Sequence, residues 1–170
     1  ISPAVSVTGM VGYSAGFFDT GSDYGVGRDA LTARIEGRFE PMQNLTLKLG
    51  YQRRFNPSFI GNFARHDRMY LGGQLVLGGV FMTGIDFAVT RSISGAALAA
   101  DGTPLDPNHL AREAWRLTTD AYAEYRATQW LAITLHVLYL ADFTDFTQVT
   151  AEPLVDPNAA FSKYQIWLGL

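Results

Sequence analysis

Residues 68–86 read RMYLGGQLVLGGVFMTGID, and Arg68 and Asp86 bracket a run of 17 uncharged residues. A run of this length is at the lower limit for a helix that spans a membrane. It contains five glycines, however, and its apolar residues alternate in two halves on either side of Gly78 and Gly79. A period of two is typical of β-strands, and a central Gly-Gly is typical of a tight hairpin turn. The stretch therefore predicts two antiparallel strands and not a helix.

The same alternation recurs along the whole chain of 170 residues. In each segment one parity is almost wholly apolar, while the other is polar, charged or small. The predicted strands cover roughly residues 4–17, 28–40, 45–55, 68–77, 81–92, 114–126, 130–143 and 161–170.

The connections between these segments also alternate. Those after the second, fourth and sixth segments are tight, whereas those after the first, third, fifth and seventh are long and rich in Gly, Pro, Asn and Asp. In an up-and-down array, alternate connections lie at the same end. The sequence therefore predicts an all-β fold in which residues 1–170 form one antiparallel, eight-stranded barrel domain, with long loops at one rim and tight turns at the other.

Composition narrows the functional classes. Charged residues make up 17% of the chain, against about 25% in typical soluble domains, and the formal net charge is -3. Because no run of Lys and Arg forms a basic patch, the sequence argues against a nucleic-acid partner. No cysteine is present, so disulfides and thiolate metal sites are excluded for these residues.

Two barrels fit the alternation. A soluble barrel would bury the apolar face around a ligand, and a membrane barrel would turn that face to lipid. The predicted strands are long enough to cross a bilayer, which takes about 9–11 tilted residues. Aromatic side chains also gather near the strand ends, as in the interfacial girdles of membrane barrels. The predicted girdles are Phe17, Tyr51, Trp115, Phe143 and Tyr164 near the long loops, and Phe39, Phe81 and Tyr125 near the tight turns.

The polar parity carries both signs of charge in mid-strand, which favours a lumen of paired charges. The predicted lumen network consists of Arg34, Glu36, Arg38, Lys48, Arg54, Arg68, Asp86, Arg116, Asp120, Glu124, Arg126, His136 and Lys163. The turn positions predict that Glu36 faces Lys48 and that Asp120 faces His136 across their hairpins. These groups form either a structural ion-pair plug or a selectivity filter.

Catalysis is not expected. Asp120 with His136 would supply a carboxylate that orients an imidazole, but no serine occurs near His136 in the lumen pattern and no hydrolase motif is recognisable. His66 and His109 are predicted to be exposed loop residues without metal-ligand spacing. The sequence thus predicts a non-enzyme with no catalytic, cofactor-binding or metal-binding residues.

The last residues, KYQIWLGL at 163–170, alternate to the end of the chain and resemble the C-terminal insertion signal of bacterial outer-membrane barrels. They depart from it in ending with Leu170 instead of an aromatic residue, and in having Gln165 where glycine is common. In architecture the chain resembles the small eight-stranded group that includes the OmpA transmembrane domain, OmpX and OmpW. The stretch LTLKLGYQRRF at 45–55 and the tight turns are also similar to larger barrels linked to polysaccharide export, of which this chain would be the C-terminal part.

These resemblances imply a location in the bacterial outer membrane. The implied partners are outer-membrane lipid, the barrel-insertion machinery through the C-terminal strand, and a protein or polysaccharide at the loops. The expected function is a non-enzymatic membrane anchor or surface module. The alternative is transport, either through a narrow channel or as part of a larger pore, and a soluble ligand-binding barrel is the third interpretation.

Overall fold

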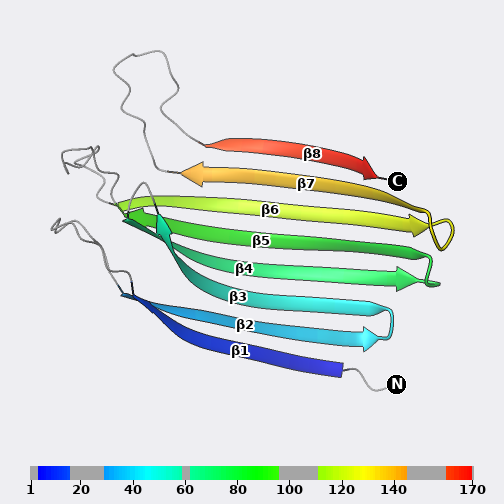
Figure 1. Cartoon of the computed structure of the whole chain (residues 1–170), viewed down its shortest axis with the longest axis horizontal. Helices are drawn as coiled ribbons and strands as arrows, with labels where there is room; N and C mark the ends of the chain where they lie inside the picture. The colour runs from blue at the N-terminus through cyan, green and yellow to red at the C-terminus, as the bar shows by residue number, and fades with distance from the viewer. Residues whose placement is uncertain (1–3, 16–28, 59–61, 96–110, 145–159, 170) are drawn as a thin grey trace, which may run out of the picture.

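A computed structural model describes residues 4–15, 29–58, 62–95, 111–144 and 160–169. They form eight β-strands and no helix, in one antiparallel sheet whose spatial order is the chain order (Figure 1). The strands are β1 (Ala4–Ala15), β2 (Asp29–Met42), β3 (Leu45–Ser58), β4 (Asn62–Leu77), β5 (Phe81–Gly95), β6 (Ala111–Arg126), β7 (Ala132–Thr144) and β8 (Phe161–Gly169). The predicted all-β, up-and-down arrangement of eight strands is confirmed.

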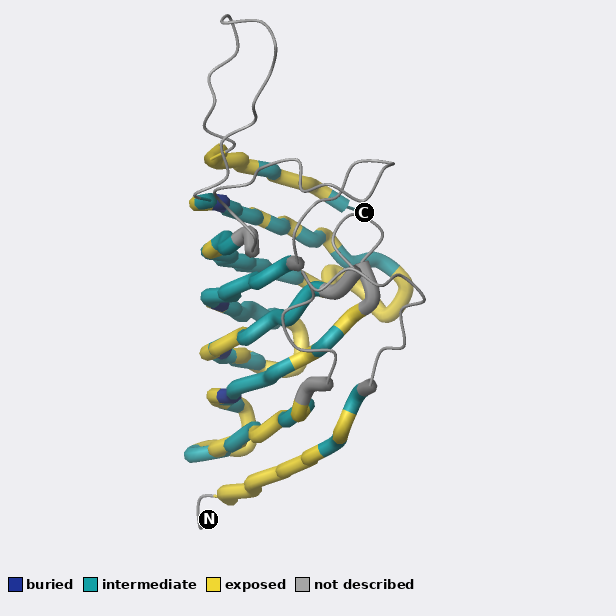
Figure 2. The backbone as a smooth tube through the Cα atoms, turned by 90° about the vertical axis from the view of Figure 1, so that its left-hand side faces the viewer, coloured by how far each residue is buried: buried dark blue, intermediate teal, exposed yellow. Residues whose placement is uncertain are grey.

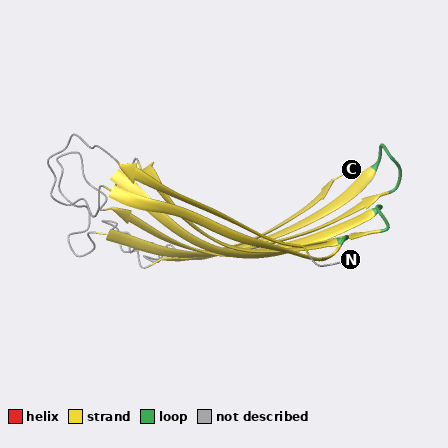
Figure 3. Cartoon of the chain, turned by 90° about the horizontal axis from the view of Figure 1, so that it is seen from below, coloured by secondary structure: helices red, strands yellow, loops and turns green. Residues whose placement is uncertain are grey.

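The sheet is twisted, curved and open (Figures 1 and 3). Within the described part of the chain, β1 pairs with β2 and β8 pairs with β7, and no pairing joins β1 to β8. Both outer strands therefore present an edge of unpaired backbone groups. β1 begins and β8 ends on the side of the sheet where the tight turns lie (Figure 1).

The tight turns follow from local sequence. Gly78 and Gly79 both have positive φ, 60° and 71°, which glycine adopts without the strain that other residues incur. The β2–β3 turn occupies positions 43 and 44, and the register shifts between Phe39 and Met42 just before it. This irregularity moves the pairing relative to a simple hairpin.

One predicted long loop is shorter than expected. β3 continues to Ser58 and β4 begins at Asn62, so most of the stretch expected to be the third connection is strand. Arg53, Arg65 and Asp67 stand there at positions of the alternation that are otherwise apolar. The alternation therefore does not predict the full length of the two strands. Arg53 and Asp67 are direct cross-strand partners, so their charges compensate each other within the sheet.

Neither face of the sheet is covered by another layer of the described chain. Ala88 and Ala141 are the buried hydrophobic residues, and large apolar side chains are widely exposed (Figure 2). Val11 is 74% exposed, Leu49 63% and Ile166 71%. The described residues thus lack a conventional hydrophobic core.

No helix among the described residues is long and apolar enough to cross a membrane.

Candidate functional site

The polar face of the sheet is the richest in chemistry. All members of the predicted lumen network are described, and the strand register places them on this one face. Members of the network form six contacts between a basic side chain and a carboxylate among the described residues. They are Arg34–Glu36 at 3.0 Å, Arg38–Glu40 at 2.7 Å, Lys48–Asp86 at 2.7 Å, Arg116–Asp142 at 2.6 Å, Arg126–Glu124 at 2.7 Å and His136–Asp120 at 3.4 Å. The pairs run along the sheet surface, between side chains of one strand or of near neighbours.

Two contacts cross an intervening strand above a glycine. Lys48 of β3 reaches Asp86 of β5 over Gly72 of β4, and a Cβ at Gly72 would collide with both side chains. Tyr70 of β4 reaches back over Gly50 of β3 and donates a hydrogen bond to Glu36 of β2 at 2.5 Å. Glycine gives these side chains room to lie flat on the sheet.

The predicted pairing of Glu36 with Lys48 is wrong. Glu36 lies opposite Gly50, and Lys48 lies opposite Arg38. The register differs by two residues from the predicted one, because the turn is centred beyond Met42. Glu36 is bound by Arg34 and Tyr70, while Lys48 pairs with Asp86.

The same displacement affects the β6–β7 hairpin. Asp120 lies opposite Leu138, and Tyr122 lies opposite His136. The predicted contact exists nevertheless, since His136 Nδ1 lies 3.4 Å from Asp120 Oδ1 along the diagonal. The His136 ring stacks on Tyr122 with centroids 5.5 Å apart, and the ring of Trp167 is inclined to it by 73° with centroids 6.5 Å apart. These contacts hold the imidazole between two aromatic side chains.

The prediction that His66 lies in a loop is wrong. His66 is half-buried in β4, and its Nδ1 lies 2.8 Å from Ser92 Oγ. His109 lies outside the described residues. Within the described ranges, no three His, Asp or Glu side chains are grouped so that they could hold a metal ion.

Two hollows lie on the polar face. One, of about 400 Å³, is lined mainly by charged groups, among them Arg34, Glu36, Arg54 and Arg68. The other, of about 490 Å³, includes His66, Arg68, Arg116 and Asp142 together with the hydroxyl-bearing residues Thr90, Ser92 and Ser94. Arg68 and Thr118 line both hollows. The two hollows therefore adjoin across the middle of the face.

The predicted aromatic girdles lie on the opposite, apolar face where they are described. Trp115 is the cross-strand partner of Phe143, and Phe81 is that of Tyr125. The ring of Tyr164 lies 4.7 Å from that of Tyr139 between centroids. The remaining members are Phe39 in β2 and Tyr51 in β3, while Phe17 lies outside the described residues.

Sequence reasoning missed a group of charges on the apolar face. We call Arg53, Arg65, Asp67, Arg91 and Glu113 the charged belt. They lie in β3, β4, β5 and β6, just beyond the apolar stretch and toward the ends away from the tight turns. Arg53 and Arg65 pair with Asp67 at 2.5 Å and 3.3 Å, and Arg91 forms two hydrogen bonds to Glu113 at 2.7 Å and 2.8 Å. The sequence does indicate this group, because charged residues replace apolar ones in the alternation at the same end of four consecutive strands.

The charged belt is tied to the aromatic girdle below it. Tyr51 donates its hydroxyl to Asp67 at 2.6 Å, and Trp115 donates its indole N–H to Glu113 at 2.8 Å. Burial alone would raise the pKa of Asp67, but hydrogen bonds from Arg53 and Tyr51 outweigh it and hold that pKa below its ordinary value. The guanidinium of Arg91 likewise lowers the pKa of Glu113. Both aromatic side chains thus turn their polar ends toward ionised carboxylates.

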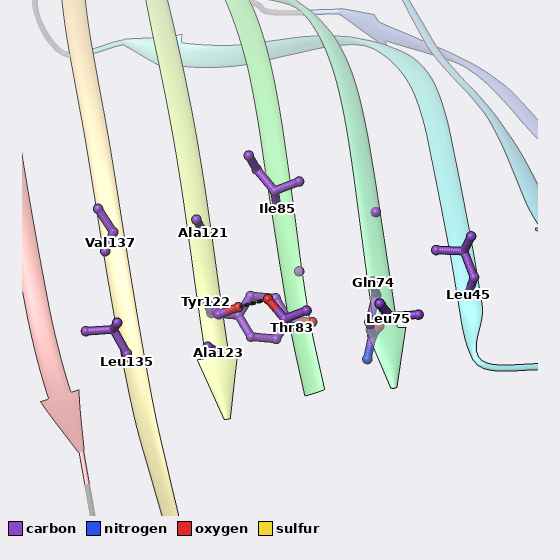
Figure 4. Close-up of a pocket in the computed structure, with 12 residues that line it drawn as sticks. Leu45, Gln74, Leu75, Thr83, Ile85, Ala121, Tyr122, Ala123, Leu135 and Val137 are labelled. Carbon is purple, nitrogen blue, oxygen red and sulfur yellow. Dashed lines mark hydrogen bonds between the residues drawn. The ribbon is translucent and has the colours of Figure 1, made fainter. Parts of the chain in front are cut away.

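The apolar face also has a shallow hollow of about 470 Å³ near the tight turns (Figure 4). Small residues, including Gly73, Ala121 and Ala123, lie among Leu45, Leu75, Ile85, Leu135 and Val137. Thr83 also lines it, and its hydroxyl is bonded to the backbone carbonyl of Tyr122 at 2.9 Å. None of the described residues that line it carries a charge, so the hollow offers mainly apolar contact.

Comparisons with protein-family models, with curated proteins and with solved structures found no significant match to this chain.

Proposed function

We propose that the sheet is part of the wall of a transmembrane β-barrel that passes polar solutes across the bacterial outer membrane. In this assignment the apolar face contacts lipid and the polar face lines a water-filled passage. The observation that carries the proposal is the uncovered apolar face, which is bounded on one side by girdle aromatics and the charged belt. An apolar surface this wide would be unfavourable in water, so we expect it to contact lipid.

The height of the apolar face fits a bilayer. Between the charged belt and the tight turns, the outward stretches of β4 and β5 span residues 69–77 and 81–89, nine residues each. A tilted strand crosses the hydrocarbon layer in about 9–11 residues. Belt charges on the same face would then lie at the headgroup level, where Trp and Tyr side chains are also favoured.

The polar face favours a passage for solutes rather than the plugged membrane anchor that the sequence predicts. Its charges pair along the wall, and glycines let Lys48 and Tyr70 lie flat. A hollow of about 400 Å³ adjoins Lys48 and Asp86, and one of about 490 Å³ lies beside it on the same face. In a narrow barrel the side chains fill the interior, whereas these charges pair with neighbours on the same sheet.

The assignment to the outer membrane rests on the likeness to bacterial barrels and on the alternating pattern of β8. Outer-membrane lipid and the barrel-insertion machinery are accordingly proposed partners, the latter through β8. A protein or polysaccharide partner at the long loops remains a proposal that concerns residues outside the described ranges.

Extraction and conductance test this function in sequence. The full chain should partition with membranes and require detergent, and recovery in buffer alone would overturn the membrane assignment. In planar bilayers the purified protein should produce discrete conductance steps. Stable insertion, shown by protease protection, without any conductance would refute transport and favour the anchor.

A further inference from the structure

A row of arginines crosses the middle of the polar face. Successive cross-strand partners from β2 to β7 are Arg34, Gln52, Arg68, Thr90, Arg116 and Asp142. The three arginines occupy every second strand, so their Cα atoms are roughly 10 Å apart at ordinary strand spacing. Gln52 and Thr90 lie between them and carry an amide and a hydroxyl, and Asp142 ends the row beside Arg116.

The three arginines differ in how their charge is compensated. Arg34 pairs with Glu36, and Arg116 binds Asp142 through two nitrogens at 2.9 Å and 2.6 Å. Among the described residues, no carboxylate lies within ion-pair distance of Arg68. Its guanidinium lies 5.6 Å from the centre of the Tyr70 ring, which leaves N–H donors available.

Arg54 adds a second uncompensated charge at the same place. It follows Gln52 by two residues in β3, so it lies on the same face as Arg68 and diagonal to it. Both arginines are exposed, and neither forms a carboxylate ion pair within the described ranges. In the hollow beside them Arg34 pairs with Glu36 and Lys48 pairs with Asp86, while Asp120 contacts His136 and no Arg or Lys of the described residues. The two guanidinium groups therefore exceed the one remaining carboxylate by a single positive charge.

The space beside these groups is suited to a ligand. Arg54 and Arg68 both line the hollow of about 400 Å³, where Gln52 and Thr118 add an amide and a hydroxyl. Arg68 also lines the hollow of about 490 Å³, which holds Thr90 and Ser92. Guanidinium groups bind carboxylates and phosphates through paired N–H donors, and nearby hydroxyl and amide groups can bind the remaining oxygens.

We propose that Arg54 and Arg68 form an oxyanion-binding site on the polar face, which takes carboxylate or phosphate groups of small solutes or sugars. Arg34 and Arg116 to either side are compensated by Glu36 and Asp142, so they do not compete for the ligand. The proposal deepens the proposed function in one respect: if the face lines a pore, the site favours anions over cations in that pore.

Direct binding tests the site without assuming a pore. Inorganic phosphate and D-glucuronate are titrated separately into the detergent-solubilised full chain by calorimetry, so that the two arms distinguish phosphate from carboxylate recognition. Arg68→Gln and Arg54→Gln should each weaken binding about tenfold or more, since each removes a charged donor group. Arg126→Gln is the matched control, because it removes the same charge from the same face where Glu124 already pairs with it, and it should change affinity less than twofold.

A conservative variant distinguishes loss of the binding group from loss of the fold. Arg68→Lys retains the charge but lacks the forked donors, so it should bind more weakly than wild type and more tightly than Arg68→Gln. Absence of binding of both probes to the wild type would overturn the site. Equal losses in Arg68→Gln and Arg126→Gln would also overturn it, because the effect would then be one of overall charge.

Reversal potentials separate this proposal from the proposed function. In a KCl gradient the wild-type pore should prefer chloride, and Arg54→Gln with Arg68→Gln should lower the chloride-to-potassium permeability ratio at least twofold. Conductance with an unchanged ratio would refute the anion site as a selectivity device and leave transport standing. Oxyanion binding without conductance would support the site and refute the pore.

Discussion

Gly50 decides where the Tyr70 side chain lies. A Cβ at position 50 would collide with the Tyr70 ring, which lies over it to reach Glu36. We expect Gly50→Ala to displace the ring, break the hydrogen bond and destabilise the fold by about 1–3 kcal/mol, as overpacking does. The measurement is the unfolding midpoint in detergent, with Gly37→Ala as control, since the nearest atom to a Cβ there is Leu49 O at 3.9 Å. Equal effects of the two changes would mean that backbone entropy, and not the ring, is responsible.

Lys48 and Asp86 should be energetically coupled. Their side chains are 41% and 43% exposed, so solvent screens the pair and the coupling should be about 1 kcal/mol or less. A double-mutant cycle of Lys48→Met and Asp86→Asn measures it from unfolding free energies.

A second cycle with Glu36→Gln in place of Asp86→Asn is the control for register. Because Glu36 is bound by Arg34 and Tyr70, its coupling to Lys48 should be clearly smaller. A larger coupling to Glu36 than to Asp86 would contradict the register of β2 and β3.

At the scale of the element, alternation predicted the eight strands and assigned side chains to faces, but it did not determine register. Both hairpin predictions were displaced by two residues, as Glu36 with Lys48 and Asp120 with His136 illustrate. A shift of two leaves every residue on its original face, so the hydrophobic pattern is the same in either register. Contacts that cross a strand, such as Lys48 with Asp86, depend on that register and on a glycine beneath them, and they were therefore missed.

The extra length of β3 and β4 was missed for a different reason. Alternation of apolar and polar residues marks a strand only where one face is apolar, and Arg53, Arg65 and Asp67 end that pattern before the strands end. Backbone pairing continues through them because their charges are compensated within the sheet. In the proposed orientation this is the point at which the strands leave the hydrocarbon layer.

The charged belt should make stability depend on acid. The pKa values of Asp67 and Glu113 lie below their ordinary values of 3.8 and 4.5, so their contribution is complete above those values and is lost as pH falls through the lowered ones. We expect the unfolding midpoint of the wild type to fall between pH 5 and about pH 3 more steeply than that of an Asp67→Asn, Glu113→Gln variant. Thermal melts in detergent at several pH values provide the comparison, and parallel curves would contradict the belt as a source of stability.

At the scale of the whole molecule, the open sheet raises the question of what pairs with β1 and β8. Unpaired backbone groups in hydrocarbon cost several kcal/mol each, so a membrane-spanning sheet must satisfy both edges. Closing eight strands on themselves would make a lumen just wide enough to be filled by side chains. The polar side chains here pair with neighbours on the same sheet and lie along its surface, an arrangement that suits a wider barrel.

We therefore expect β1 and β8 to pair with other strands and not with each other. The sequence contains no cysteine, so introduced pairs can be cross-linked without background. Val7→Cys combined in turn with Tyr164→Cys, Ile166→Cys or Leu168→Cys should give no cross-link with a short thiol reagent in membranes. Val137→Cys with Ile166→Cys is the positive control, because these residues are direct partners in β7 and β8. Efficient cross-linking of Val7 to any β8 position would instead indicate an eight-stranded barrel, in which the same polar side chains must fill the lumen and the proposed passage would be closed.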